Sequence, residues 1–401
     1  MSDHLVIVGG GLAGFTTAQE LRKHGSDVAI TIVDPEGLPY DRPPLSKEYF
    51  DGSMPAEKLA FRPESWYSEN AVELVSERVT RLLPGEGKLE LGNGQVLSAS
   101  NTVLSLGGRA RTLPIPGGDL PGLLELRTIA DADKLRETLK PGMRFAIIGA
   151  GLIGAEVAST AVKMGAEVSL IDPVPVPLVP ACGAILAGRL HDMHEAHGVK
   201  VHCAMTQQIE LVGEEYRITL ADGTIVVADA VLVAVGLVPN TELAQDAGIT
   251  VDNGVIVDDE QRSSIPTVFA AGDVARHRLA DGTLGRRHEH WESAMHAGQT
   301  VAAALAGQPL PVHGAGWMWS DRYGIHLEAV GDMVNGTEVL RHVDGLPAAA
   351  FRLDDEGHMI GAATIDGGNT VRAARRIIDR GIIVDPEKLA DSSIDLKKLA
   401  R

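Results

Sequence analysis

Residues 4–34 read HLVIVGGGLAGFTTAQELRKHGSDVAITIVD, and this stretch decides the fold of the chain. An apolar strand leads into a glycine-rich turn, an Ala-rich helical stretch follows, and a second apolar strand ends at Asp34. Gly9, Gly11 and Gly14 have the spacing G-x-G-x-x-G at the point where the first strand becomes the helix. That order of elements is typical of a strand–helix–strand unit that binds a dinucleotide.

Each residue of this motif has a physical reason. The first glycine permits the tight turn, the second lets backbone N–H groups approach a pyrophosphate, and the third lets the helix pack on the strand. The N-terminus of the helix adds partial positive charge, and Asp34 is placed to accept hydrogen bonds from ribose hydroxyls. The alternative is a glycine turn that packs and binds nothing, but the complete context favours a nucleotide site.

The motif occurs a second time, in residues 143–172, which read MRFAIIGAGLIGAEVASTAVKMGAEVSLID. Here Gly149, Gly151 and Gly154 form the turn, and the second strand ends at Asp172. No Lys or Arg follows Asp172 until Arg189, so a 2′-phosphate would face a carboxylate without a cation to pair with it. We therefore expect NADH rather than NADPH at this site, the alternative for Asp172 being an ordinary exposed acid at a strand end.

Two such units predict an α/β fold with two Rossmann-like dinucleotide-binding domains. We expect one domain to be discontinuous, over residues 1–110 and 240–315, with a second domain inserted at residues 111–239. Between the units, Asn93-Gly94 is a strong hairpin signal among short strands. After Gly316 the pattern changes to strands and a late helix, which predicts a small α+β domain over residues 316–401.

Composition narrows the class of protein. The 401 residues carry a formal net charge of −18, which argues against nucleic acid or an anionic membrane as the main partner. Cys182 and Cys203 are the two cysteines, so no disulfide scaffold is expected. No signal sequence and no apolar run of about 18 residues is found, which predicts a cytoplasmic protein. The histidines near residue 290 lack metal-ligand spacing, so no metal site is expected.

Further segments carry a resemblance to a known family. They are PYDRPPLSK at residues 39–47, AAGDVA at 270–275, RHEHWESAMHAGQ at 287–299 and WMWSDRYGIHLEAVG at 317–331. With both glycine motifs, they resemble the pyridine nucleotide-disulfide oxidoreductase superfamily. Within it, PPLSK and WMWSD resemble the NADH-dependent ferredoxin and rubredoxin reductases that serve Rieske dioxygenases and cytochromes P450.

The resemblance implies FAD at the first motif and NADH at the second. Ala13 and Asp34 are then expected to hold the adenosine half of FAD, Arg42 to face its pyrophosphate, and Asp273 to hold its ribityl chain. The helix after Asp273 would point its N-terminus at the flavin. The resemblance also implies FAD contacts by Val79, Arg127 and Trp291, although Val79 and Trp291 have plain core packing as an alternative.

Two residues are expected to act on the flavin. The resemblance places Lys47 near flavin N5, paired with Glu156 on the helix after the second motif. The alternatives are a solvated charge for Lys47 and a water-facing helix residue for Glu156. Trp319 is expected beside the flavin, with packing between domains as its alternative. On the nicotinamide side, the resemblance implies contacts by Ile153, Glu156, Val235, Gly236 and Glu289.

The chain departs from its disulfide-reducing relatives. Those relatives carry a redox cysteine near the flavin, where this chain has Pro43, Pro44, Leu45 and Ser46. The departure argues against disulfide reduction. The expected reaction is hydride transfer from NADH to FAD, followed by single-electron release to a [2Fe-2S] ferredoxin or a rubredoxin. The alternatives are an NADH oxidase or peroxidase and a non-enzymatic flavoprotein acting in signalling or assembly.

An acidic ferredoxin would need a locally basic docking face on this acidic chain. Two patches are candidates, one of them a helical face whose alternative is ordinary solvation. The first comprises Arg276, Arg278, Arg286 and Arg287, and the second comprises Arg372, Arg375, Arg376 and Arg380. The residues do not decide between a monomer and a homodimer.

Overall fold

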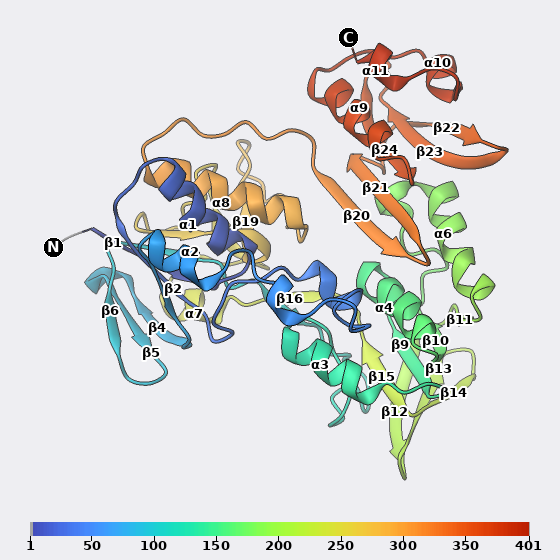
Figure 1. Ribbon diagram of the computed structural model, residues 1–401, viewed down its shortest axis with the longest axis horizontal. Helices are drawn as coiled ribbons and strands as arrows, with labels where there is room; N and C mark the ends of the chain where they lie inside the picture. Colours follow the sequence, from blue (N-terminus) through green and yellow to red (C-terminus); the bar gives the residue numbers. More distant parts are fainter. Residues whose placement is uncertain (1–2, 401) are drawn as a thin grey trace. The chain divides into compact units, whose positions relative to one another are not determined.

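The computed structural model describes residues 3–400 and divides the chain into two compact units (Figure 1). Each unit is assembled from three separate segments of the chain. The first unit comprises Met1–Arg42, Ala56–Arg109 and Leu237–His313, and the second comprises Pro43–Pro55, Ala110–Gly236 and Gly314–Arg401.

A parallel sheet in the order β18-β7-β1-β2-β3 forms the centre of the first unit. In its register Val8 at the end of β1 lies opposite Val33 on one side and Leu104 on the other. The strands are nearly continuous apolar runs, as expected where both faces of a parallel sheet are covered. They span β1 His4–Val8, β2 Ala29–Val33, β3 Val72–Val75, β7 Asn101–Leu104 and β18 Val268–Ala270.

Two helices of this unit, α1 (Leu12–Lys23) and α8 (Trp291–Leu305), pack side by side in Figure 1. Gly298 permits the approach, because a Cβ at that position would lie 2.6 Å from the Ala13 carbonyl oxygen. Phe15 of α1 is buried beneath them and stacks on Phe61. The N-terminal glycine turn is thus held by a packed layer of helices.

Short elements complete the first unit. The hairpin predicted at Asn93-Gly94 is confirmed, because it joins the antiparallel strands β5 and β6 and Gly94 has a φ of 85°. The elements are α2 Glu64–Glu69, β4 Val79–Leu83, β5 Lys88–Leu91, β6 Val96–Ser98, β8 Gly108–Ala110, β16 Leu237–Pro239, α7 Glu242–Asp246, β17 Val255–Val257 and β19 Ala275–His277.

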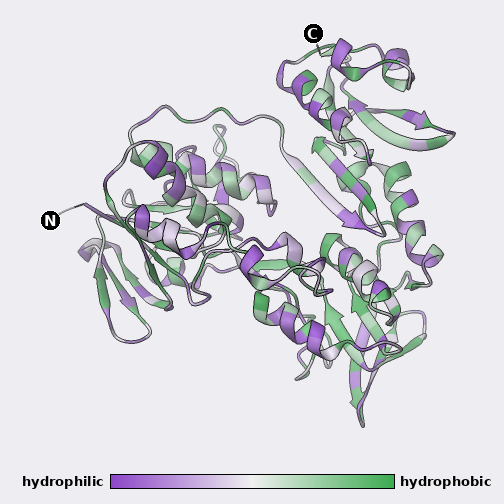
Figure 2. Cartoon of the chain, viewed as in Figure 1, coloured by the Kyte–Doolittle hydropathy of each residue, from purple (hydrophilic) through white to green (hydrophobic). Residues whose placement is uncertain are grey.

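The second unit repeats the strand–helix–strand order of the first. Its parallel sheet has the order β11-β10-β9-β15, and its strands are largely hydrophobic in Figure 2. A smaller antiparallel sheet, β12-β13-β14, turns at Asp222-Gly223. The elements are α3 Ile129–Thr138, β9 Arg144–Ile148, α4 Leu152–Lys163, β10 Glu167–Ile171, α5 Val179–Cys182, α6 Ala184–Ala196, β11 Lys200–His202, β12 Thr206–Val212, β13 Glu215–Leu220, β14 Ile225–Ala228 and β15 Ala230–Val233.

The C-terminal part of the second unit is an antiparallel sheet in the order β20-β21-β24-β23-β22 with α9 packed on it. Val371, Ala374 and Ile377 of α9 are buried, so an apolar face of this helix packs on the sheet. The elements are β20 Trp317–Arg322, β21 Ile325–Gly331, β22 Thr337–Val343, β23 Leu346–Leu353, β24 Met359–Ile365, α9 Gly368–Asp379, α10 Pro386–Ala390 and α11 Leu396–Leu399.

The predicted fold class is confirmed, with two dinucleotide-type units and a C-terminal α+β part. The division into three domains stays a prediction, because the two compact units group the residues differently. Residues 43–55, which we assigned to the FAD domain, belong to the second unit, as do residues 111–236 of the inserted part and the C-terminal part. Residues 237–239 belong to the first unit. Within residues 3–400 no helix is both long and apolar enough to cross a bilayer.

Candidate functional site

The first glycine turn joins β1 to α1, and packing explains two of its three glycines. Gly9 has a φ of 108°, and a Cβ there would clash with the Ser105 carbonyl oxygen. A Cβ at Gly14 would clash with the Gly9 carbonyl oxygen. Gly11 differs, because its φ of −63° suits any residue and a Cβ there would meet no atom of the described residues within 4 Å. Neither conformation nor packing requires a glycine at residue 11.

The second turn, between β9 and α4, repeats this geometry. Cβ atoms at Gly149 and Gly154 would clash with backbone oxygen atoms, those of Ala234 and Gly149. Gly151 has a φ of −68°, and within residues 3–400 no atom lies within 4 Å of a Cβ placed there. At both helix N-termini the middle glycine therefore borders open space, as the close approach of a pyrophosphate requires.

The acid at the end of each second strand holds its glycine turn. Asp34 accepts hydrogen bonds from the backbone N–H of Gly10 at 2.6 Å and of Glu36 at 2.8 Å. Asp172 accepts the equivalent bonds from Ala150 at 2.7 Å and from Val174 at 2.8 Å. Both carboxylates keep further lone pairs, so these contacts are compatible with ribose binding.

A pocket opens at the first turn. Arg42 lies at its edge, donating to the Tyr40 hydroxyl at 2.8 Å and to Glu36 Oε1 at 2.9 Å. Tyr40 in turn donates to Glu36. The guanidinium is therefore oriented before any ligand arrives, which suits a phosphate contact. The pocket is lined by Gly10, Gly11, Asp34, Glu36, Gly37, Leu38, Pro39, Tyr40 and Arg42.

The other predicted FAD contacts of the first unit lie in three places. Ala13 is buried on α1, where a Cβ at Gly272 would lie 3.0 Å from it, beside Asp273. Trp291 begins α8 and donates from Nε1 to Asp41 Oδ1 at 2.8 Å. Val79 is a buried member of the core around β4. The helix expected after Asp273 begins only at Trp291, because a one-turn 3₁₀ helix, β19 and a loop come first.

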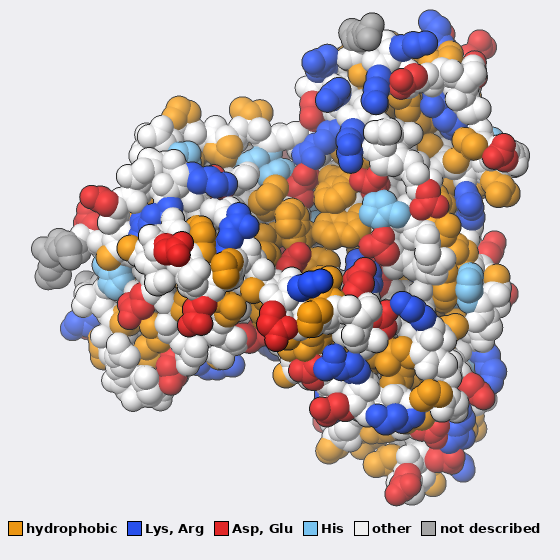
Figure 3. Space-filling model, viewed as in Figure 1, with side chains coloured by type: hydrophobic (Ala, Val, Ile, Leu, Met, Phe, Trp, Pro, Cys, Tyr) orange, Lys and Arg blue, Asp and Glu red, His pale blue; other side chains and the backbone are white. Residues whose placement is uncertain are grey.

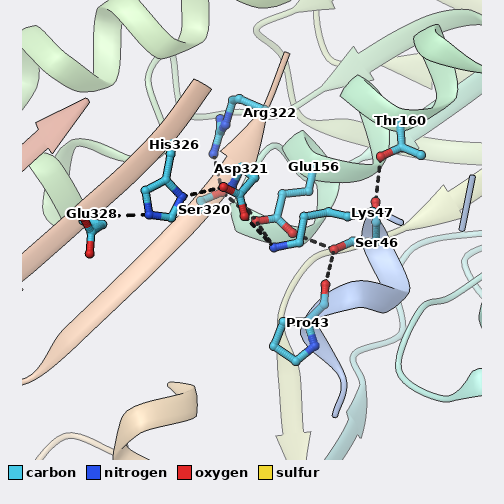
Figure 4. Close-up of polar contacts among 10 residues, drawn as sticks. All are labelled: Pro43, Ser46, Lys47, Glu156, Thr160, Ser320, Asp321, Arg322, His326 and Glu328. Carbon is cyan, nitrogen blue, oxygen red and sulfur yellow. Dashed lines mark hydrogen bonds and ion pairs between the residues drawn. The ribbon is translucent and has the colours of Figure 1, made fainter. Parts of the chain in front are cut away.

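A buried polar cluster in the second unit contains the predicted Lys47–Glu156 pair (Figure 4). Lys47 Nζ lies 3.8 Å from Glu156 Oε1 and 2.9 Å from Asp321 Oδ2. The Glu156 carboxylate accepts hydrogen bonds from the hydroxyls of Ser46 at 2.6 Å and Ser320 at 2.8 Å. Glu156 is buried on α4 rather than facing water, and it stays ordered by these partners.

Arg322 brings a second cation to this cluster. It is 4 % exposed and donates from Nη2 to the Ser320 hydroxyl at 3.1 Å. Burial lowers the pKa of the Arg322 guanidinium, and the nearby Glu156 carboxylate opposes that effect. Glu156 is thus balanced by charge from two sides, as a buried carboxylate requires.

The cluster continues from Asp321 to the edge of the C-terminal sheet. His326 Nδ1 lies 2.6 Å from Asp321 Oδ1, and His326 Nε2 lies 3.8 Å from Glu328 Oε2. Burial alone would raise the pKa of Asp321, but hydrogen bonds from His326 and Lys47 outweigh it and leave that pKa below its usual value. Asp321 is therefore a carboxylate shared by two basic groups.

The two tryptophans of WMWSD stack on one another in β20, with ring centroids 4.8 Å apart. Lys47 Nζ lies over the Trp319 ring, 5.7 Å from its centroid. The aromatic pair therefore borders the polar cluster within the second unit. The tryptophans belong to one strand, and the predicted position of Trp319 beside a flavin stays a prediction.

Comparisons with known proteins identify the family. The family model described as pyridine nucleotide-disulphide oxidoreductase matches residues 3–299, and the reductase C-terminal model matches residues 317–400. The chain belongs to the pyridine nucleotide-disulphide oxidoreductase family. Enzymes of this family are oxidoreductases, and the match implies FAD and NADH as cofactors.

Relatives of this family match over the whole length. The ferredoxin–NAD(+) reductase subunit of a benzene 1,2-dioxygenase system from Pseudomonas putida is 35 % identical over 100 % of this chain and 98 % of its own. The ferredoxin reductase subunit of a 5,5′-dehydrodivanillate O-demethylase from Sphingobium is 36 % identical over 98 % and 97 %.

Solved structures of the family also match over nearly the whole chain. The covalent putidaredoxin reductase–putidaredoxin complex matches with a TM-score of 0.92 and 31 % identity, over 99 % of this chain and 98 % of that one. The ferredoxin reductase for the CYP199A2 system from Rhodopseudomonas palustris matches with a TM-score of 0.94 and 33 % identity, over 100 % of both chains.

The remaining predicted site residues of this oxidoreductase are dispersed. Ile153 is 45 % exposed in the first turn of α4, and Val235 and Gly236 follow β15. Arg127 precedes α3, and its backbone N–H donates to Asp131 at 3.0 Å. Glu289 pairs with Arg287 at 2.6 Å in the first unit. The individual roles of all these residues stay predictions.

The two cysteines of this oxidoreductase lie in different environments. Burial raises the pKa of the Cys182 thiol on α5 to about 12, so the thiol is protonated at neutral pH. Cys203 is exposed. Among the described residues, no group of three or more metal-ligating side chains forms a metal site.

The arginines of the two basic patches differ in their contacts. Arg276 and Arg287 of the first patch are committed to backbone carbonyls, including those of Gly285 and Asp273. Arg372 and Arg376 of α9 are exposed, as are Arg278 and Arg286 of the first patch. Figure 3 shows Lys and Arg side chains gathered over the C-terminal helices.

Sequence reasoning found Lys47 and Glu156 but missed most of their partners. Ser46, Ser320, Asp321, Arg322 and His326 complete the cluster. All five residues belong to the segments PYDRPPLSK and WMWSDRYGIHLEAVG, which were quoted for the resemblance. The charged run Asp321-Arg322 in an otherwise aromatic strand was the available signal.

Proposed function

We propose that this chain is a reductase that takes electrons from NADH and passes them singly to a ferredoxin of an oxygenase system. The observation that carries the proposal is the pair of glycine turns. Each turn has a middle glycine that neither packing nor conformation requires, at Gly11 and at Gly151. Two nucleotide sites in one chain suit the transfer of electrons between two cofactors.

The residues present fit FAD at the first turn and NADH at the second. The first pocket combines open space at a helix N-terminus, an oriented Arg42 and the acid Asp34. At the second turn Asp172 is followed by Pro173-Val174-Pro175, with no cation for a 2′-phosphate, which supports NADH over NADPH.

When bound, the flavin supplies the chemistry that links a two-electron donor to a one-electron acceptor. The chain supplies orientation and charge. Lys47 is the proposed residue beside flavin N5, and Glu156 and Asp321 hold its ammonium group from two sides. A fixed ammonium group beside the flavin would stabilise the negative charge that the flavin gains on reduction. The raised pKa of Cys182 supports a route without a thiol.

A ferredoxin is the proposed partner because the relatives are named as ferredoxin reductases and one related structure holds a putidaredoxin. The arginines of α9 are the proposed docking face. Rubredoxin is the alternative acceptor.

The test is NADH-driven reduction of a panel of ferredoxins and rubredoxins by the purified flavoprotein, with cytochrome c as a nonspecific control. We expect a yellow protein that NADH bleaches without air and that reduces at least one ferredoxin far faster than cytochrome c. Rapid NADH consumption with oxygen or peroxide alone would instead identify an oxidase or peroxidase. A colourless or NADH-inert protein would contradict the proposal and favour a non-enzymatic role.

A further inference from the structure

His326 on β21 is the imidazole of the polar cluster in Figure 4, and it bridges two carboxylates. Its Nδ1 lies 2.6 Å from Asp321 Oδ1, and its Nε2 lies 3.8 Å from Glu328 Oε2. The side chain is 42 % exposed, so it exchanges protons directly with solvent. Histidine is the side chain that ordinarily changes charge between pH 5 and 8.

The carboxylate between His326 and Lys47 is shared. Asp321 uses Oδ1 for the imidazole and Oδ2 for Lys47 Nζ, at 2.9 Å. Lys47 has a second carboxylate within reach, since Glu156 Oε1 lies 3.8 Å from Nζ. Lys47 thus stands between two carboxylates, and one of them, that of Asp321, also contacts the His326 imidazole.

The charges around His326 come from several elements. Two cations, Lys47 and Arg322, face four carboxylates in and beside the cluster. Asp366, which follows β24, accepts the backbone N–H of His326 at 2.8 Å. The other three carboxylates are Glu156 on α4, Asp321 on β20 and Glu328 on β21. Protonation of His326 supplies the third cation of a group in which negative charge is in excess.

We propose that His326 is a positioning residue whose protonation controls, through Asp321, how tightly Lys47 is held. A protonated imidazole competes for Asp321, which weakens the Asp321–Lys47 pair and favours the Lys47–Glu156 pair. A neutral imidazole leaves Asp321 to Lys47. The link to catalysis rests on the proposed function, in which Lys47 lies beside the flavin, whereas the coupling of the three side chains does not.

The coupling is tested by proton NMR titration of the histidine rings in the holoenzyme from pH 5 to 9. The His326 signals are assigned by their loss in His326→Gln. We expect Asp321→Asn to lower the midpoint of the His326 titration, because the imidazolium loses its carboxylate. Lys47→Met should raise that midpoint, because Asp321 is then left to the imidazole.

A matched control removes an exposed histidine of the same sheet, His342 on β22. His342→Gln should leave the His326 midpoint unchanged. Far-ultraviolet circular dichroism establishes that each variant is folded. A His326 midpoint that neither Asp321→Asn nor Lys47→Met moves would overturn the inference.

The consequence for the reaction is tested by the rate at which NADH bleaches the flavin across the same pH range. The wild type and His342→Gln should be faster at low pH, by roughly fivefold, because a protonated His326 partly neutralises Asp321 and leaves more of the Lys47 charge for the flavin. His326→Gln should keep the slow rate at every pH. His326→Lys should keep the fast rate, because its charge is fixed.

The outcomes separate the two proposals. If both His326 variants keep the wild-type pH profile, the control by His326 is wrong while the reductase function stands. If no protein in the series is bleached by NADH, the proposed function fails. In that case the NMR midpoints alone decide whether His326, Asp321 and Lys47 are coupled.

Discussion

At the scale of single residues, the informative positions are glycines that the fold itself does not need. Gly11 and Gly151 occupy N-cap positions with extended backbone that any residue adopts. Gly14 and Gly154, by contrast, are required by contact with the preceding turn. A single added methyl group therefore separates ligand binding from folding.

Gly11→Ala should remove FAD from the purified protein, and Gly151→Ala should keep FAD but raise the KM for NADH by about tenfold or more. The added methyl group occupies the space that a pyrophosphate needs, and each N-cap change destabilises the fold by only about 1 kcal/mol or less. Flavin absorbance per protein and steady-state kinetics measure the two effects.

Gly188→Ala serves as the control, since a Cβ there also meets no protein atom within 4 Å and the position lies on α6 outside both turns. It should change neither property. A Gly11→Ala protein that retains full flavin would contradict the assignment of the first turn.

At the scale of elements, α6 is tied to the C-terminal sheet by a buried histidine. His194 is fully buried, and its Nδ1 lies 2.8 Å from the hydroxyl of Tyr323 in the turn between β20 and β21. Its Nε2 has no protein partner among the described residues. Burial lowers the pKa of His194 to about 3. The folded protein therefore keeps this imidazole neutral well into acid.

The lowered pKa of His194 predicts that acid destabilises the second unit. The folded pKa is below the unfolded value of about 6.5, so below pH 6.5 only the unfolded chain takes up the proton. The stability that neutral His194 contributes is thus present above pH 6.5 and falls progressively toward pH 3. Between pH 7 and pH 4, the unfolding free energy of the wild type should fall by about 3 kcal/mol more than that of His194→Gln, as measured by urea titration.

His342→Gln is the exposed control for this measurement and should follow the wild type at both pH values. A wild-type protein and a His194→Gln protein that lose stability in parallel would show that His194 is protonated in the folded state.

Local patterns made the glycine turns, the hairpin at Gly94 and the amphipathic α9 predictable. Each depends on residues within about one helix–strand unit, so spacing alone is informative. The partners of Lys47 were not predictable in this way. Asp321 and His326 lie far along the chain. The contact of Asp321 with Lys47, and through it the link to His326, depends on β20 packing against α4, which no local rule specifies. The same long-range packing assigns residues 43–55 to the second unit.

At the scale of the whole molecule, the distribution of charge governs how an acidic protein partner would bind. The chain carries a formal net charge of −18, whereas α9 presents exposed Arg372 and Arg376 above a buried apolar face. Arg380 beyond the helix donates to the Ala400 carbonyl at 2.8 Å and so also fixes the C-terminal segment. A local positive face on an acidic protein steers an acidic partner to one orientation.

Reversing Arg372 and Arg376 together to Glu should lower kcat/KM for ferredoxin about tenfold at low salt. The loss should shrink as added salt screens the interaction. NADH-driven reduction of ferricyanide, a small acceptor, should be unchanged. Arg217→Glu, an exposed reversal on β13, is the control. Equal ferredoxin rates in all three proteins would place the docking face elsewhere.

The interleaving of the two compact units has a consequence for how the chain is made. Strand β18, which completes the first sheet, lies at Val268–Ala270, and the last segment of that unit ends at His313. Chains emerge from the ribosome N-terminus first. The sheet that contains β1 therefore cannot be completed until β18 has been synthesised. Contacts between such distant residues also form slowly. The glycine turn at residues 9–14 is thus among the first parts to emerge, but its sheet is completed only after residue 270 has been made.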